Sequence, residues 1–434
     1  MFRVFGNAWK IPDLKKKILF TVIVLVLYRL GSAIPVPYVD GAELSKLMEG
    51  ASDTLFGYFN MLSGYAFSQG TLFALGVSPY ITASIVIQLL TIAIPALERM
   101  SKAGPEGQAK ISKITRYVTI VLAIITAYGY YITIKNTYPG LIADGWFPAV
   151  VIVVTLTAGA SIVMWTGERI DDKGIGNGIS MILFANIVSR GASLVTTMYQ
   201  LIRDGFDLDI KSGTTQTLWV LLAIIMMLVI IALTVFFSNS ERRLNVQYAK
   251  RQVGRKMYGG MSTSLPIKVL MSGVMPIIFA NAIVMMPATL AMIFPSWEAG
   301  VTKWFSASSD YPFYVIATFL LIVGFAYFYL SISFNTVEVA NNLKKNGGTI
   351  LGYRPGKPTA DYLKKVVNRV TLMGSVFLSF MAIFPILLSW TGQPALQYLV
   401  FGGTSMIILV SVALETTRQL ESEITMRHYK GFLD

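Results

Sequence analysis

Long apolar runs are the feature of this sequence that most limits what it can fold into. A helix needs about 20 predominantly apolar residues to cross the hydrocarbon of a bilayer. Hydrophobic residues make up 54% of the 434 positions and charged residues only 14%, whereas about a quarter is charged in soluble proteins. The sequence therefore predicts an all-α integral membrane protein with ten transmembrane helices, at Ile18 to Pro37, Thr71 to Leu97, Tyr117 to Ile134, Trp146 to Thr166, Ile175 to Tyr199, Thr217 to Phe237, Val269 to Phe294, Tyr311 to Phe334, Val370 to Trp390 and Leu396 to Leu414.

Several kinds of chemistry are excluded by composition and motif. The chain has no cysteine and a single histidine, His428, which rules out disulfides, iron–sulfur clusters, thiol catalysis and Cys- or His-based metal sites. It also lacks the H-E-x-x-H, G-x-S-x-G and P-loop patterns, which mark metalloproteases, hydrolases and nucleotide sites. We therefore expect neither a cofactor nor a bound metal, and no enzymatic activity.

The positive charges indicate which side of the membrane each connection occupies. If the N-terminus is cytoplasmic, 29 of the 36 Lys and Arg residues fall on the cytoplasmic side and six on the outside. Such a bias is the positive-inside signal of multi-pass proteins. Both termini are then cytoplasmic.

The predicted helices divide into two sets of five at about residues 200 to 216. We therefore expect an N-terminal half over residues 1–200, an external hinge loop over 201–215 and a C-terminal half over 216–434. An odd number of helices makes the second half start from the opposite face of the membrane, so related halves must form an inverted repeat with the function at their interface. Similarity between the two halves is too weak to establish that relationship from the sequence alone.

Two long connections, at about residues 239–268 and 335–369, are cytoplasmic and strongly basic. The simpler explanation is that this positive charge only fixes the topology of the chain in the membrane. Length and the turn residues Gly347, Gly348 and Arg354 to Pro358 favour a shaped docking surface for a large acidic partner. The residues expected to make that contact are Arg242, Arg243, Lys250, Arg251, Arg255, Lys256, Arg354 and Lys357.

Ionisable residues are almost absent from the predicted spans, which favours a channel over the alternative, a secondary transporter of a small solute. Ion coupling usually requires ionisable groups near the bilayer midplane. Arg29 and Arg190 lie near the outer third of their spans and are expected to reach toward the membrane surface. The amides of Asn60, Gln88, Asn177, Asn186 and Asn281 are expected to form hydrogen bonds between helices.

The "GIGNG" stretch, Gly174 to Gly178, is expected to start a helix.

The segment "FNMLSGYAFSQG", Phe59 to Gly70, fits neither a transmembrane helix nor an ordinary loop. It is too polar to cross lipid and too apolar for water. Irregular backbone at membrane depth is tolerated only where it is buried in protein or faces a water-filled cavity. We therefore expect this segment to be buried in protein or to face such a cavity. The alternative interpretation is a re-entrant loop at the membrane interface.

Several blocks along the chain together resemble the SecY/Sec61 family of protein-conducting channels. They are "FNMLSGYAFSQGTLFALGVSPYITASIVIQLL", "GIGNGIS", "YAKRQVGRKMYGG", "MPIIFANAIVMMPATL", "GYRPGKPTADYL", "FGGTSMIILV" and the tail "HYKGF", in that order. The resemblance implies two inverted five-helix halves that form a clamshell around an hourglass pore. It implies a bacterial cytoplasmic membrane location and the partners SecE, SecG, the SecA motor ATPase, the ribosome, a translocating polypeptide with a signal sequence, and membrane lipid.

The same resemblance assigns residues to three parts of such a channel. A pore ring is implied at Ile81, Ile85, Ile179, Leu183, Ile278 and Ile408. A plug is implied at about residues 53–70, with Phe59, Asn60, Met61, Leu62, Ser63, Gly64 and Tyr65 at its centre. A lateral gate, where the second and third helices meet the seventh and eighth, is implied at Ser84, Gln88, Thr91, Asn281 and Met286.

Overall fold

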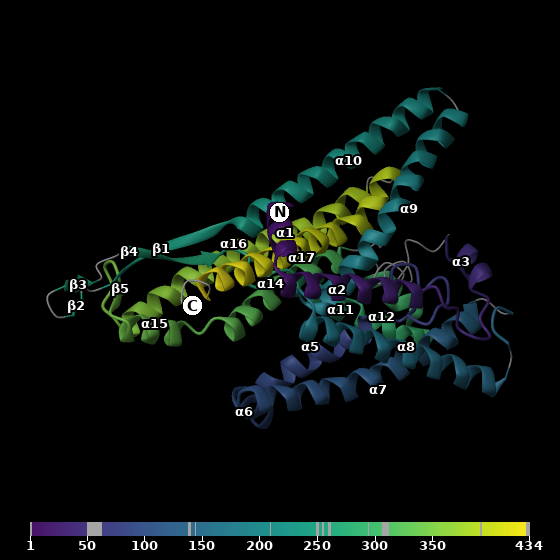
Figure 1. The fold of residues 1–434 in the computed structure, drawn as a ribbon. Coiled ribbons are helices and arrows are strands. Elements are labelled where there is room, and N and C mark those ends of the chain that lie inside the picture. Colours follow the sequence, from purple (N-terminus) through teal and green to yellow (C-terminus); the bar gives the residue numbers. More distant parts are fainter. Residues whose placement is uncertain are drawn as a thin grey trace.

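The computed structural model describes residues 2–49, 63–137, 140–143, 145–208, 210–248, 251–253, 256–258, 262–293, 295–305, 312–390 and 393–430. Figure 1 shows long helices with a narrow β-sheet projecting from one end. The helices are α1 (Phe2–Lys10), α2 (Pro12–Gly31), α3 (Gly41–Glu49), α5 (Ser78–Ala93), α6 (Pro95–Lys102), α7 (Pro105–Thr137), α8 (Trp146–Lys173), α9 (Gly178–Leu208), α10 (Ile210–Asn239), α11 (Met275–Val284), α12 (Met286–Ile293), the short 3₁₀ helix η1 (Pro295–Trp297), α13 (Glu298–Phe305), α14 (Phe313–Ser333), α15 (Thr336–Lys345), α16 (Lys357–Ser389) and α17 (Pro394–Lys430).

Each of the ten predicted spans contains a helix, but fewer helices qualify as membrane spans by themselves. Within the described residues, five are long and apolar enough to cross a bilayer, and a sixth results if α5 and α6 are counted together. The other predicted spans are shorter, divided or more charged; α2, for example, contains Lys15, Lys16, Lys17 and Arg29. The protein is therefore a multi-pass membrane protein, while the ten-helix architecture stays a prediction.

Proline explains where one predicted span breaks. The axis bends by 102° between α5 and α6, where Ile94 is extended (φ −107°, ψ 113°) and Pro95 begins α6. A proline restricts the preceding residue to extended conformations and has no N–H to continue the helix. The chain thus turns sharply where the sequence predicts one continuous span to Leu97.

The all-α prediction is wrong for the basic connections, which contain strands. β1 (Glu241–Tyr248) pairs antiparallel with both β4 (Ser262–Lys268) and β5 (Gly348–Ile350), in the order β4-β1-β5. β2 (Arg251–Val253) pairs with β3 (Lys256–Tyr258). Side chains alternate across a strand, and in β1 the buried Leu244 and Val246 alternate with exposed neighbours. This period of two was a signal in the sequence.

The sheet joins two connections that the sequence presents separately. Val246 of β1 lies opposite Ile350 of β5, about a hundred residues later in the chain. The buried Leu343 of α15 and Leu363 of α16 pack into the same cluster as Val246 and Ile350. The described parts of residues 239–268 and 335–369 therefore build one body, and β1, β4, β5 and α15 lie together at one end of the molecule in Figure 1.

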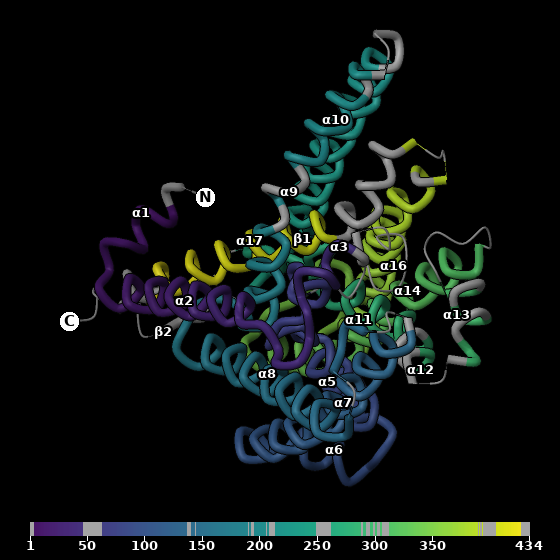
Figure 2. Tube along the Cα trace, turned by 90° about the vertical axis from the view of Figure 1, so that its right-hand side faces the viewer, coloured from purple at the N-terminus to yellow at the C-terminus, as the bar shows by residue number. Residues whose placement is uncertain are grey.

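The segment predicted as an external loop at residues 201–215 is largely helical. Residues 201–208 continue α9, and residues 210–215 belong to α10. Apolar Leu201 and Ile202 pack with Met198, Val220 and Ala223 in a small cluster between these helices. That packing extends both helices beyond the predicted spans, and in Figure 2 α9 and α10 project together from the rest of the molecule.

Candidate functional site

The six residues of the implied pore ring belong to, or pack against, the largest buried cluster among the described residues. Ile81, Ile85, Leu183, Ile278 and Ile408 are members of this cluster, and Ile179 is partly buried against it. Ile81 and Ile85 are one helical turn apart on α5, as are Ile179 and Leu183 on α9, so each pair shares one face of its helix. The result is a buried aliphatic cluster to which four helices contribute side chains.

This cluster combines both halves of the chain. The ring residues on α5 and α9 precede residue 200, whereas those on α11 and α17 follow it. α5 contacts α11, and α9 contacts α17. Any separation of these helix pairs would open the aliphatic cluster between them.

The implied plug is described only from Ser63 onward; Phe59, Asn60, Met61 and Leu62 lie outside the described residues. Residues 63–70 have a turn-rich backbone in which Gly64 (φ 64°) and Tyr65 (φ 72°) are left-handed. Phe67 N–H donates to Ser63 Oγ at 3.0 Å, and the Tyr130 hydroxyl of α7 donates to the Phe67 carbonyl at 2.9 Å. This irregular segment is buried in protein, as its position near apolar helices requires.

Residues of the implied lateral gate lie on α5, α11 and α12. Ser84, Gln88 and Thr91 are partly buried on α5, Asn281 is buried on α11, and Met286 is exposed at the start of α12. The Tyr329 ring of α14 lies 5.5 Å from the ring of Phe279 on α11. Tyr329 thus packs α14 against α11, and the sequence reasoning missed it because a tyrosine in an apolar run is not distinctive.

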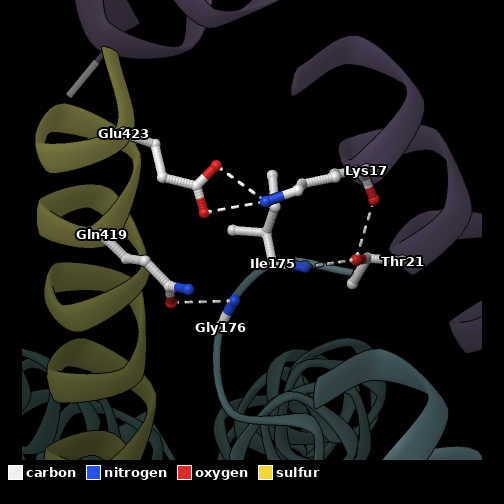
Figure 3. A network of polar contacts seen from close by, with 6 residues as sticks. All are labelled: Lys17, Thr21, Ile175, Gly176, Gln419 and Glu423. Carbon is white, nitrogen blue, oxygen red and sulfur yellow. Dashed lines mark hydrogen bonds and ion pairs between the residues drawn. The ribbon is translucent and has the colours of Figure 1, made fainter. Parts of the chain in front are cut away.

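Figure 3 shows a three-way junction of α2, α17 and the turn before α9, formed by Lys17, Thr21, Ile175, Gly176, Gln419 and Glu423. Lys17 Nζ donates to both Glu423 carboxylate oxygens, at 3.0 and 2.9 Å. Ile175 N–H donates to Thr21 Oγ1 at 3.0 Å, and Gly176 N–H donates to Gln419 Oε1 at 3.1 Å. Two successive amides of the turn are therefore held from opposite sides by the first and last long helices.

The "GIGNG" stretch starts α9, as the sequence predicts. Gly176 is left-handed (φ 82°), and the Asn177 Oδ1 atom accepts from Ser180 N–H at 3.1 Å. This is the N-cap bond that satisfies a free amide of the first helical turn. Asn177 therefore caps its own helix, whereas the sequence predicts a bond between helices for it. Asn186 does form such a bond, from its Nδ2 to the Tyr28 hydroxyl at 3.0 Å.

The structure describes the side chains of only some of the implied docking residues. Arg242, Arg243, Arg354 and Lys357 are exposed. Arg251 and Lys256 lie on β2 and β3, without described side chains, and Lys250 and Arg255 lie outside the described residues. Near the root of β4, partial burial and then the neighbouring Arg418 lower the pKa of Lys268. Lys268 therefore gives up its proton more readily than a fully exposed lysine does.

Arg29 is the clearest difference between the predicted and observed roles. The sequence predicts that its side chain reaches toward the membrane surface. The structure instead directs Nη1 of Arg29 to the carbonyl oxygen of Gly64, at 3.3 Å. Because this acceptor lies 35 residues away in an irregular segment, no local pattern identifies it.

Comparison with known proteins agrees with these features. The SecY family model matches residues 71–417. The chain is 43% identical to the protein translocase subunit SecY of Streptomyces galbus, over the whole of both chains. It is also 41% identical to the protein translocase subunit SecY of Corynebacterium glutamicum. That match covers 98% of this chain and 99% of the relative.

Solved structures share the fold at lower sequence identity. A structure described as a protein conducting channel covers 94% of this chain and 92% of its own, with a TM-score of 0.70 and 21% identity. Sec61 in a canine ribosome-channel complex from the endoplasmic reticulum covers the same shares, with a TM-score of 0.66 and 20% identity.

The apolar helices and the aliphatic cluster between them define a multi-pass helical membrane protein of the channel type. The chain belongs to the SecY family.

Proposed function

We propose that this chain forms the channel of a bacterial protein translocase. Unfolded polypeptides would cross the cytoplasmic membrane through it, and hydrophobic segments would leave it sideways into lipid. The observation that carries this proposal is the buried aliphatic cluster to which both halves contribute, with Ile81 and Ile85 from one half and Ile278 and Ile408 from the other. The proposal is also supported by relatives that are named protein translocase subunit SecY and match nearly the whole of this chain.

An aliphatic ring suits a conduit for chains of any sequence. A narrow apolar constriction excludes ions because water leaves it. It also offers no hydrogen bonds that would hold a passing peptide. The same side chains would thus seal the closed channel and let polypeptides of different sequence pass without binding them.

The plug at residues 53–70 would close the outer side of the ring. The lateral gate would separate α5 and α7 from α11, α12 and α14, and the contacts of α5 with α11 and of α7 with α12 support that location. Transfer of apolar surface from water to lipid releases about 25 cal/mol per Å². This free energy would drive a signal sequence or membrane segment out through the gate.

The proposed architecture has ten transmembrane helices in two inverted halves, residues 1–200 and 216–434, that hinge near residues 201–215. Both termini and the body formed by residues 239–268 and 335–369 would face the cytoplasm, as the distribution of Lys and Arg supports. Exposed Arg242, Arg243 and Arg354 would then be available to acidic partners.

The channel itself would have no enzymatic activity, so a partner must supply the energy. We propose the SecA motor ATPase or a translating ribosome as the partner at the basic body, and SecE and SecG as small membrane subunits. A structural neighbour in a ribosome-channel complex supports the ribosome as one such partner.

The test is transport into proteoliposomes that contain this chain with SecE, SecG and SecA. We expect ATP-dependent protection of a signal-bearing preprotein from added protease. A preprotein without its signal sequence is the control and should stay accessible. Solute uptake driven by a proton gradient, with no preprotein protection, would instead support the secondary transporter.

A further inference from the structure

Arg29 places a positive charge on a backbone carbonyl inside the protein. It lies near the end of α2, and its Nη1 donates to the Gly64 carbonyl oxygen at 3.3 Å. Charge-assisted hydrogen bonds are stronger than neutral ones, and an arginine within a membrane protein is costly unless protein groups solvate it. The contact therefore stabilises the backbone of residues 63–70 and the cation together.

The surroundings of Gly64 are closely fitted. A Cβ atom at this left-handed position would lie 2.9 Å from Arg29 Nη1 and 3.0 Å from Asn186 Oδ1. Asn186 of α9 is itself oriented by its hydrogen bond to the Tyr28 hydroxyl. Tyr28, Arg29 and Asn186 thus form a socket for Gly64, which we call the Gly64 socket.

This socket adjoins the aliphatic ring. Tyr28 stacks on Phe73, with ring centroids 5.3 Å apart. Both aromatic residues belong to the buried cluster that contains Ile81, Ile85 and Leu183. A displacement of Gly64 would therefore disturb side chains that pack with the ring.

Residues 63–70 have a second anchor on another helix. The Tyr130 hydroxyl of α7 donates to the Phe67 carbonyl at 2.9 Å, and the two rings meet edge to face. The first anchor comes from α2 and the second from α7, and they hold carbonyl groups three residues apart. Of the two, only Arg29 contributes a full charge.

We propose that Arg29 is a positioning residue that holds residues 63–70 beside the aliphatic ring and so stabilises the closed channel. This inference rests on the proposed sealing role of the plug region. Opening would require the Gly64 carbonyl to leave the guanidinium. Loss of the charge should therefore favour the open state, even without a signal sequence.

The experiment uses the absence of cysteine from the chain. Ala66, which is 1% exposed, is replaced by cysteine in the complex with SecE and SecG, and its reaction with a water-soluble maleimide is timed. Arg29→Met, which keeps length but has no donor, should accelerate labelling about tenfold, the factor expected for loss of one charged hydrogen bond. Arg29→Lys keeps one charged donor and should restore most of the protection. Arg203→Met, at an exposed arginine, should leave the rate unchanged.

Conductance in planar bilayers separates this inference from the proposed function. Faster labelling in Arg29→Met without ion leak would uphold the positioning role and contradict the sealing role of the plug. Unchanged labelling, with leak after deletion of residues 54–68, would overturn the positioning role and leave the proposed function intact. If Arg29→Met does not accumulate, Gly64→Ala tests the socket from the other side. Its added Cβ meets Arg29 and Asn186 and should also accelerate labelling, and an unchanged rate would overturn the proposal.

Discussion

Lys17 on α2 and Glu423 on α17 form an ion pair with Nζ 2.9 Å from Oε2, although 406 positions separate them in the chain. The same two helices and the turn before α9 also meet in a small apolar cluster that includes Leu14, Ile175 and Leu420. Together with Thr21 and Gln419, the ion pair fixes the turn before α9 between the first and last long helices. This junction is a contact between the two halves of the chain.

Reversal of one charge in this pair should destabilise the protein. Lys17→Glu places two carboxylates together, and we expect the free energy of unfolding to fall by about 1 kcal/mol, the upper range for partly exposed pairs. The double variant Lys17→Glu, Glu423→Lys should recover most of the loss. Thermal unfolding in detergent measures both effects.

The exposed pair of Lys102 and Glu98, at 2.6 Å on α6, is the matched control. Because solvent screens it, the same reversal there should shift the transition much less. Equal effects at both pairs would contradict a specific contribution from the junction.

Gly178 should not tolerate even a methyl group. A Cβ atom there would lie 1.9 Å from the Gly167 carbonyl oxygen of α8, so α9 must move away from α8. We expect Gly178→Ala to lower the unfolding temperature clearly. Gly191→Ala, on the same helix with nothing within 4 Å, should be neutral or stabilising by up to about 1 kcal/mol through helix propensity.

Arg354 should be required for the motor and not for folding. It is exposed, and its own carbonyl accepts a hydrogen bond from Thr359 Oγ1 at 2.8 Å, which shapes the turn. Arg354→Glu should stop SecA-driven transport in proteoliposomes while insertion and thermal stability persist. Arg354→Lys should rescue only part, because lysine cannot bind a carboxylate or phosphate in two places. Normal transport by Arg354→Glu would refute this docking role.

Loss of the plug and loss of the ring should have different effects on ion leak. Deletion of residues 54–68 removes the plug but leaves the ring able to close, so we expect intermittent leak and continued transport. Replacement of Ile81, Ile85, Ile278 and Ile408 by asparagine keeps the constriction hydrated and should produce persistent leak. The same four positions changed to leucine should remain silent, because the ring stays apolar.

Single-channel conductance without a translocating substrate distinguishes these cases. If the four-asparagine channel were silent while the plug deletion conducted continuously, the ring would not be the principal seal.

Local patterns predicted those features that depend on solvent and on neighbouring residues. Apolar runs predicted helices because a buried or lipid-facing backbone must satisfy its own hydrogen bonds. The glycines of "GIGNG" predicted the start of α9 because Gly176 adopts a left-handed conformation there. The strand β1 could also have been predicted, since its Leu244 and Val246 alternate with polar residues, but the expectation of an all-α protein left that pattern unused.

Hydrophobicity and several motifs lie in short stretches of the chain, so the multi-pass membrane class and the SecY family could be predicted without coordinates. The contacts between distant residues could not be predicted in this way. The Arg29 guanidinium reaches the Gly64 carbonyl, and Val246 pairs with Ile350. A backbone carbonyl or strand edge has no signature of its own in the sequence, so these partners are chosen by the packing of the helices that bring them together.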